Sequence, residues 1–287
     1  MAKERVSVAG LGEVGHPLFE LLRESGKFEV YGFDVDEAKM REACMHGQDG
    51  LPGEVDVRHA CIPCGGQNKF VDTVVSYMER VKPKLVIIHS TVPPGTTRKL
   101  FERCGCRVVH SPVRGVYESL EHMKWELRRW TEYVGGADVE AAETAREHLE
   151  KLGLKTKVLK GSLETELAKL FEPTYRACII ICFQEMHRIS KYFGADFDGV
   201  ADFLEDTHRV RFDRPVMFPD VIGGHCLIPN VEFLLKSHDS EFLRLILEFN
   251  ERRREEVKDE SIRSEVEKIR KTVGALEKAV HQRRIYD

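Results

Sequence analysis

The sequence lacks an apolar run close to the roughly 20 residues that a bilayer-spanning helix needs. It also lacks an excess of one charge, because 44 Lys and Arg residues face 48 Asp and Glu residues and leave a formal net charge of −4. Proteins that bind nucleic acids or anionic membranes usually present a basic face, so we expect neither kind of partner. Since the N-terminal residues lead directly into a predicted strand, we expect a soluble, cytoplasmic protein.

Cysteine is present but gives no sign of a disulfide scaffold. The eight cysteines lie in apolar or strand-like segments of a 287-residue chain, which is long enough to bury its own core without cross-links. The pairs Cys61/Cys64 and Cys104/Cys106 have spacings that also occur in zinc sites. In a parallel sheet the first pair would follow the end of a strand and the second would precede a strand, at opposite edges. We therefore predict free thiols and no metal.

Short apolar strands alternate with helical segments over the first half of the chain. This alternation predicts an α/β fold, with a doubly wound parallel sheet of the Rossmann type. The segments after it are mainly helical. The predicted strands are 6–9, 28–33, 57–62, 85–89, 107–110 and 155–159, and the predicted helices include 37–44, 70–80, 139–152 and 163–193.

The first predicted strand runs into a glycine-rich loop, Gly10-Leu11-Gly12-Glu13-Val14-Gly15, and a predicted helix follows the loop. In a dinucleotide-binding fold these three glycines permit a tight turn, close approach of a pyrophosphate, and packing of the helix on the strand. Asp34 ends the next strand, where a carboxylate would bind the ribose hydroxyls and repel a 2′-phosphate. We therefore predict NAD as the cofactor. The predicted cofactor-binding residues are Gly10, Gly12, Glu13, Val14, Gly15, Asp34, Pro63, Ser90 and Thr91.

These segments suggest a division into domains. We assign residues 1–136 to an NAD-binding Rossmann domain, 137–160 to the last strand and helix of the α/β part, and 161–250 to a helical central domain. Residues 251–287 form a charged C-terminal helix. Its apolar residues recur at alternating spacings of four and three, which indicates either a coiled coil or a helix that packs on its own chain. They are Ile262, Val266, Ile269, Val273, Leu276 and Val280.

Three later segments resemble those of the UDP-glucose/UDP-N-acetylmannosamine (UDP-glucose/GDP-mannose) dehydrogenase family. They are Ser90-Thr-Val-Pro-Pro-Gly-Thr-Thr97, Glu166-Leu-Ala-Lys-Leu-Phe-Glu-Pro-Thr-Tyr-Arg176 and Ile222-Gly-Gly-His-Cys-Leu-Ile-Pro229. With the glycine loop, they follow the family's order and spacing over roughly residues 4 to 250. Family members oxidise a primary alcohol of a sugar nucleotide to a carboxylate with two NAD, through a cysteine-bound thioester.

The resemblance implies a catalytic role for three residues. Cys226 matches the nucleophile that forms the thioester, Lys169 matches the lysine that supports the oxyanion, and Thr91 matches a threonine near the nicotinamide and the catalytic water. It also implies a homodimer built on the apolar helix from Leu167 to Phe193, and a small-molecule substrate, possibly a sugar nucleotide.

The chain departs from the family's pattern in four ways. Val113 replaces a glutamate that is an acid–base candidate, Pro173 replaces an asparagine, and Asn230 replaces an aspartate. Inside a helix, Pro173 would clash with the carbonyl of Lys169 at a cost of about 3 kcal/mol, unless the helix kinks or starts there. The fourth departure is length, because family members continue into a second Rossmann-like domain that grips the UDP moiety, where this sequence enters the charged helix.

Three functions remain open at this point. The first is an NAD-dependent oxidation of an alcohol, possibly of a sugar or sugar nucleotide, with Cys226 and Lys169 in the roles above. The second is a single hydride transfer like that of 3-hydroxyacid dehydrogenases. The third is a catalytically altered NAD-binding scaffold or regulatory subunit. The replaced residues also leave open a chemistry rearranged around His225, Arg114 or Glu166.

Overall fold

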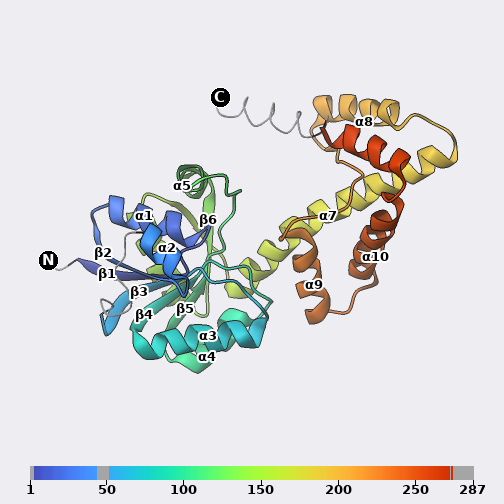
Figure 1. The fold of residues 1–287 in the computed structure, drawn as a ribbon. Helices are drawn as coiled ribbons and strands as arrows, with labels where there is room; N and C mark the ends of the chain where they lie inside the picture. Colours follow the sequence, from blue (N-terminus) through green and yellow to red (C-terminus); the bar gives the residue numbers. More distant parts are fainter. Residues whose placement is uncertain (1–2, 44–51, 272, 274–287) are drawn as a thin grey trace. The chain divides into compact units, whose positions relative to one another are not determined.

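The computed structural model describes residues 3–43, 52–271 and 273. Contacts within the chain divide it into two compact units, Met1–Lys169 and Leu170–Asp287. Figure 1 shows an α/β unit and a helical unit. The fold class expected from the sequence is therefore confirmed, while the expected domain boundaries remain a prediction.

A seven-stranded sheet forms the centre of the first unit, in the order β2-β1-β3-β4-β5-β6-β7. Neighbouring strands are parallel except β5 and β6, which are antiparallel. The sequence did not predict this antiparallel pair, but an antiparallel strand near the edge is common in large doubly wound sheets. The strands are β1 (Glu4–Ala9), β2 (Phe28–Phe33), β3 (Glu54–Ala60), β4 (Lys82–Ile88), β5 (Arg107–His110), β6 (Thr131–Gly136) and β7 (Lys155–Val158).

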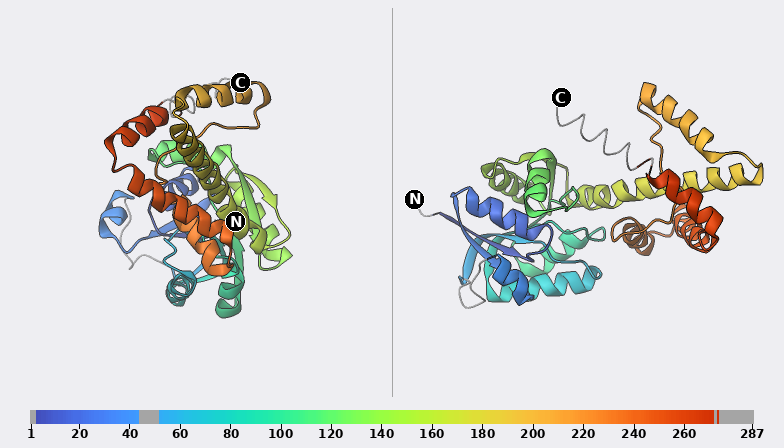
Figure 2. Two further views of the ribbon diagram at one scale, coloured as in Figure 1. Left: turned by 90° about the vertical axis from the view of Figure 1, so that its right-hand side faces the viewer. Right: turned by 45° about the horizontal axis from the view of Figure 1, so that its top comes forward.

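Helices cover both faces of this sheet (Figure 2). The face that carries Val57, Ile87 and Val109 packs against apolar residues of α1 (Gly15–Glu24), α5 (Leu120–Arg129) and α6 (Val139–Lys151). The opposite face packs against α3 (Gln67–Arg80) and α4 (Thr96–Cys104). The short helix α2 (Glu37–Glu42) follows β2, and Cys44, the end of the predicted helix 37–44, lies outside the described residues.

The second unit consists of helices. They are the greater part of α7 (Ser162–Tyr192), together with α8 (Phe197–Arg211), α9 (Leu227–Ser237), α10 (Glu241–Glu256) and a helical segment at 260–271. Pro173 lies inside α7 and does not end it. The missing proline N–H leaves the carbonyl of Lys169 without its usual helical donor. Among the described residues, no helix has the length and apolar character to cross a membrane.

The apolar seam of the C-terminal helix is buried on its own chain at Val266, Ile269 and Val273, whereas Ile262 is half-buried. Val266 and Val273 are 1% and 3% exposed, and Lys268 and Arg270 pair with Asp198 and Asp220. This part of the helix therefore packs within the second unit, although Leu276 and Val280 lie outside the described residues.

The cysteines lie where the sequence suggested. Cys61 and Cys64 follow β3, whereas Cys104 and Cys106 precede β5 and have their sulfurs 3.4 Å apart. The seven cysteines within the described part of the chain are free thiols. No group of three or more His, Cys, Asp or Glu side chains there is arranged to hold a metal ion.

Candidate active site

The glycine-rich loop joins β1 to α1 at the carboxyl edge of the sheet. Gly10 has φ +91°, and a Cβ there would lie 2.5 Å from the carbonyl oxygen of Cys61. A Cβ on Gly15 would lie 1.7 Å from the carbonyl oxygen of Gly10, whereas one on Gly12 would meet nothing within 4 Å. No side chain caps the N-terminus of α1 and no acidic residue lies in its first turn. The loop thus fits the pyrophosphate of a dinucleotide, which would meet open backbone at Gly12 and the positive end of a helix.

Asp34 lies beside this loop, at the end of β2. Its carboxylate accepts hydrogen bonds from Leu11 N (2.7 Å) and Asp36 N (2.9 Å), which fix its orientation and leave lone pairs for a ligand. Glu13 is exposed, so its charge is directed to solvent. The other predicted cofactor residues lie at the same edge, because Pro63 follows β3 and Ser90 and Thr91 follow β4.

A buried carboxylate fixes the loop after β4 to helix α7. Glu166 is fully buried, and its Oε1 accepts hydrogen bonds from Thr97 N (2.7 Å) and Thr97 Oγ1 (2.6 Å). Its Oε2 accepts one from Gly95 N (2.6 Å). Burial raises the pKa of Glu166 despite these bonds. Glu166 therefore caps the N-terminus of α4, and this structural task separates it from the acid–base role left open above.

Lys169 lies one turn beyond Glu166 on α7. Its Nζ donates to the carbonyl oxygen of Val113 at 2.8 Å. The clamp at Glu166 thus holds the helix of Lys169 against the loop that carries Thr91. Thr91 and Lys169, two of the three residues expected to be catalytic, therefore belong to one unit.

Two buried histidines hold the segments that follow β4 and β5. His89 Nδ1 donates to the carbonyl oxygen of Ser111 (2.8 Å), and His110 Nε2 donates to that of Ser90 (3.1 Å). His89 therefore anchors Ser111, the residue after His110, and His110 anchors Ser90, the residue after His89. Burial lowers the pKa of His89 to about 4 and that of His110 to about 3, so both are neutral donors near pH 7. These two hydrogen bonds were not predicted from the sequence, although His89 and His110 both end predicted strands.

Cys226, the third expected catalytic residue, lies in the second unit. It is exposed and immediately precedes α9. The loop before it is anchored by Asn250 of α10, which accepts from Ile222 N (2.7 Å) and donates to the carbonyl oxygen of Ile222 (3.2 Å). His225 is exposed on the same loop.

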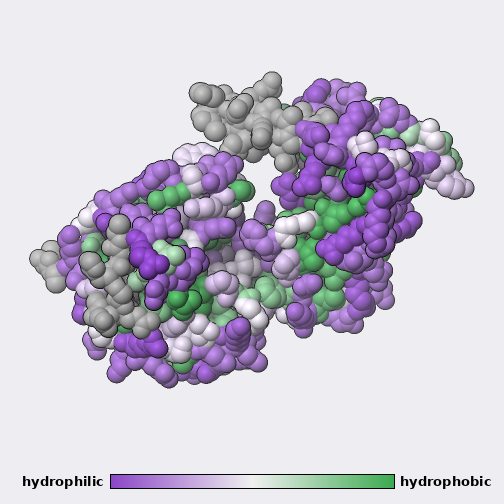
Figure 3. All heavy atoms as spheres, viewed as in Figure 1, coloured by the Kyte–Doolittle hydropathy of each residue, from purple (hydrophilic) through white to green (hydrophobic). Residues whose placement is uncertain are grey.

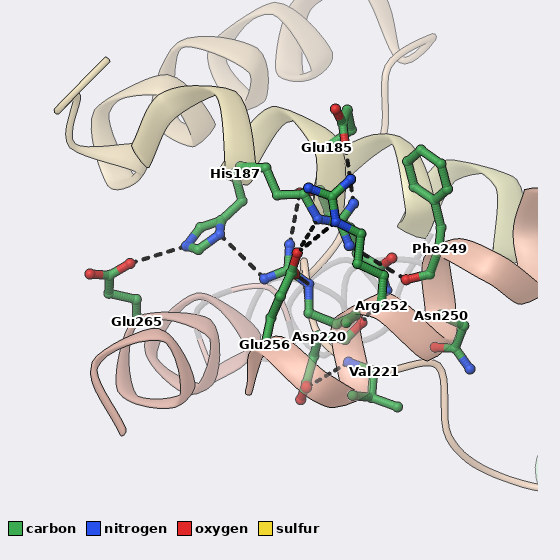
Figure 4. A network of polar contacts seen from close by, with 12 residues as sticks. Glu185, His187, Asp220, Val221, Phe249, Asn250, Arg252, Glu256 and Glu265 are labelled. Atoms are coloured by element: carbon green, nitrogen blue, oxygen red, sulfur yellow. Dashed lines mark hydrogen bonds and ion pairs between the residues drawn. The ribbon is translucent and has the colours of Figure 1, made fainter. Parts of the chain in front are cut away.

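A charged network secures the start of this loop (Figure 4). The carbonyl oxygen of Asp220 accepts from Gln184 Nε2 (2.7 Å), and Asp220 Oδ2 pairs with Arg270 (2.9 Å). Arg253 of α10 is fully buried, donates to the carbonyl oxygen of Gln184 (2.7 Å) and has its Nε 3.3 Å from Glu256 Oε2. The loop that leads to Cys226 is thus tied to α7, α10 and the 260–271 helix.

Two replaced positions also have defined places. Val113 is buried in the core of the first unit, and its carbonyl oxygen receives Lys169. Asn230 is 5% exposed on α9, one turn after Cys226. Arg114 lies over the rings of Trp130 (4.8 Å) and Tyr133 (5.2 Å) and donates to the carbonyl oxygen of Thr131.

One part of the chain is similar to a domain of a known protein family. Residues 163–252 match the central domain of the UDP-glucose/GDP-mannose dehydrogenase family. Over this stretch, which is about a third of the chain, the sequence is similar to that family. The match includes Glu166, Lys169 and Cys226.

Longer members of the family match a larger part of the chain. It is 27% identical to the UDP-N-acetyl-D-mannosamine dehydrogenase of Methanocaldococcus jannaschii, over 86% of this chain. The chain spans only 65% of that relative's length. A solved structure of a UDP-D-ManNAc dehydrogenase from Pyrococcus horikoshii has a TM-score of 0.70 at 23% identity, covering 86% of this chain and 68% of that one.

Another structural neighbour lies outside the sugar-nucleotide dehydrogenases by name. It is a 3-hydroxyisobutyrate dehydrogenase from Mycobacterium tuberculosis, with a TM-score of 0.67 at 18% identity, covering 90% of this chain and 95% of that one. At this identity, the likeness concerns the fold alone.

Proposed function

We propose that the chain is an NAD-dependent dehydrogenase that oxidises an alcohol of a sugar nucleotide, of the UDP-N-acetylmannosamine or UDP-glucose type. The observation that carries the proposal is the Glu166 clamp, which joins the Ser90–Thr97 loop to the helix of Lys169 at the sheet edge that also carries the glycine loop. A cofactor-binding loop and an amine held at the same edge of the sheet are what alcohol oxidation requires.

The residues have separate tasks in this proposal. Gly10, Gly12 and Gly15 admit the pyrophosphate and Asp34 holds the ribose, while NAD supplies the oxidising power by accepting hydride. Lys169 stabilises the oxyanion that forms on the substrate, and Thr91 orients the attacking water. The Cys226 thiolate adds to the aldehyde to give a thiohemiacetal, a second NAD would accept hydride from this adduct to give the thioester, and water then cleaves the thioester to release a carboxylate and the free thiol.

Capture of the thioester tests this proposal directly. The full chain is incubated with NAD and either UDP-N-acetylmannosamine or UDP-glucose, and its intact mass is measured while NADH is counted. We expect a covalent adduct and two NADH per substrate. Cys226→Ala should abolish the adduct, whereas Cys182→Ala, which removes another exposed thiol, should retain it. No adduct and no NADH over a broad panel of alcohols would contradict the proposal.

A single-step dehydrogenase of the 3-hydroxyacid type is the second candidate. The fold of the 3-hydroxyisobutyrate dehydrogenase, 95% of which is covered by this chain, is compatible with it. One NADH per substrate and a carbonyl product, both insensitive to Cys226→Ala, would identify this reaction. NAD binding without turnover would instead identify the scaffold or regulatory subunit.

We also propose a homodimer formed through the second unit. Apolar side chains reach the surface there (Figure 3), among them Phe171, Tyr175 and Tyr192 of α7, which are 53%, 67% and 84% exposed. The apolar run in α7 is only partly covered within one chain, since Ile181 is buried but Cys182 is exposed. A monomeric mass by light scattering at micromolar concentration would contradict the dimer.

A further inference from the structure

Glu132 is a buried acid whose side chain is not used by the interactions described so far. It lies on β6 and is 3% exposed, and neither carboxyl oxygen has a hydrogen-bond partner among the described residues. An ionised carboxylate in such a place is costly unless a cation or a donor compensates it. The carboxyl is therefore either neutral or coupled to a nearby charge.

The positions of the strands bring Glu132 to the segment that receives Lys169. In the antiparallel pair, His110 lies opposite Gly135 and Val109 opposite Gly136. Extended by three residues beyond the end of β5, this register brings Val113 opposite Glu132, and the side chain of the next residue, Arg114, donates from Nη2 to the carbonyl oxygen of Thr131. Lys169 Nζ donates to the carbonyl oxygen of Val113 itself.

The ionisable neighbours of Glu132 agree with this placement. Burial raises the pKa of Glu132 to about 8, and the positive charges of Arg114 and Lys169 oppose the rise. Arg114 is committed to Trp130, Tyr133 and the carbonyl oxygen of Thr131. We therefore consider Lys169 the neighbour that exchanges a proton with Glu132.

A second buried polar group without a partner lies on the same face. Ser111 Oγ is fully buried and has no hydrogen-bond partner in the described part of the chain. Since side chains alternate along a strand, Ser111 and Val113 share a face with their opposite residues Val134 and Glu132. The segment that follows β5 and the start of β6 thus carry two buried polar side chains, Ser111 and Glu132, near the carbonyl oxygen of Val113 that receives Lys169.

We propose that Glu132 is a positioning residue that acts as the proton partner of Lys169. The inference rests on the proposed oxidation. Ionised Glu132 takes a proton from the Lys169 ammonium and leaves a neutral amine. As the substrate is oxidised, its O–H bond breaks and this amine takes the proton, while NAD takes the hydride. The proton held by Glu132 then passes to water, so the charges balance over a turnover.

The first test does not depend on turnover. The full chain is labelled with ¹³C at the glutamate carboxyl, and the resonance absent from Glu132→Gln is followed against pH. We expect a midpoint near pH 8 in the unaltered chain, and a midpoint higher by about one pH unit in Lys169→Met, because a nearby positive charge has been removed. A midpoint near 4.5, or one that Lys169→Met leaves unchanged, would overturn the proposal.

The second test is the pH profile of NADH formation. In the unaltered chain kcat should rise with pH through about 8, as Glu132 ionises. Glu132→Gln should lower kcat by roughly 10²-fold, with a small effect on KM, and should remove this rise. Glu132→Asp should restore part of both. Glu126→Gln is the matched control, because Glu126 is also buried but accepts a hydrogen bond from Trp130 Nε1, and it should leave the profile unchanged.

The two tests separate the two proposals. If the unaltered chain makes no NADH from any alcohol tested, the proposed oxidation fails, and the carboxyl titration alone decides whether Glu132 and Lys169 form a pair. If NADH forms but Glu132→Gln keeps the rate and the pH profile, the oxidation stands and the role of Glu132 is refuted.

Discussion

The first unit buries a row of histidine rings that are hydrogen-bonded to one another through their ring nitrogens, whereas the second unit buries an arginine that pairs with a carboxylate. In the first unit His59 Nδ1 lies 2.8 Å from His89 Nε2, and His59 Nε2 lies 3.0 Å from His148 Nε2. In the second, Arg253 is fully buried and Glu256 is shared by Arg188, Arg252 and Arg253. The comparison separates a network that must stay neutral from one that must stay charged.

The histidine row has a fixed direction. Because Ser111 O only accepts, His89 Nδ1 carries a proton, and a neutral His89 then accepts at Nε2 from His59 Nδ1. His59 Nε2 in turn accepts from His148 Nε2. His148 Nδ1 meets Glu4 Oε1 at 2.7 Å, so one further proton resides at this outer end. The inner members of the row are stable only while they are neutral.

The largest predicted effect is acid sensitivity of the first unit. Burial lowers the pKa values of His59, His89 and His110, so these groups take up protons on unfolding. Their contribution is present above the unfolded value near 6.5 and is lost as pH falls toward the lowered values. For each of these three histidines, the free energy of unfolding should fall by up to about 1.4 kcal/mol for every pH unit by which the pH is lowered within that window.

Tryptophan fluorescence can measure this effect in one unit. Both tryptophans of the chain, Trp125 and Trp130, lie in the first unit. Urea unfolding followed by their emission should show a falling midpoint from pH 6.5 to pH 5. In the second unit His187 is shifted in the same direction, so hydrogen exchange there should show a weaker acid dependence. A first unit of constant stability over this range would remove the contrast between the networks.

The second prediction concerns the charged network. Arg253→Met should destabilise the second unit by about 3 kcal/mol, because it leaves the carbonyl oxygen of Gln184 without its buried charged donor, while Glu256 keeps Arg188 and Arg252. Arg252→Met is the matched control, since the Arg252 side chain is 61% exposed and pairs with the same Glu256; its effect should be about 0.5 kcal/mol. Hydrogen exchange in α7 and α10 measures both, and equal losses would show that burial is not what matters.

Removing the Glu166 clamp should have a smaller effect. Glu166→Gln keeps one acceptor oxygen and loses the other, so one backbone N–H at the start of α4 remains unpaired at a cost of about 1 to 3 kcal/mol. Glu164→Gln changes an exposed acid on the same helix and should cost little. Thermal unfolding followed by tryptophan emission compares the two. A matching loss in both variants would mean that the cap does not stabilise the unit.

Sequence periodicity predicted much of the first unit because its strands are short, buried and separated by clear turn residues. Segment 107–110 matches β5 residue for residue. The orientation of β6 was not predictable, because residues 131–136 contain two glycines and a glutamate in place of an apolar run. Helix α7, most of which belongs to the second unit, was predicted as 163–193 in spite of Pro173, which lies inside the helix and does not end it.

The candidate site was harder to predict where it depends on contacts between distant residues. The glycine loop, Asp34 and Cys226 were visible as local motifs. Glu166 was visible only as part of a motif, and its role as a cap depends on residues about 70 positions away. The local signal at Glu132 was weak, because it consists only of a charged residue on the same strand face as the buried Val134. Its proposed role depends on Val113 across the strand pair and on Lys169 beyond Val113, which the sequence alone does not bring together.

The smallest predicted effect concerns Asp34, a carboxylate that belongs to neither network. Asp34→Asn keeps an acceptor for Leu11 N but loses the charge that would hold the ribose hydroxyls and repel a 2′-phosphate. NAD binding should weaken about 10-fold, roughly 1.4 kcal/mol, while NADP binding should weaken less or improve. Asp36→Asn, at the exposed N-cap of α2, should leave the ratio of the two affinities unchanged. Calorimetric titration of both nucleotides measures that ratio, and equal weakening would show that Asp34 does not contact the ribose.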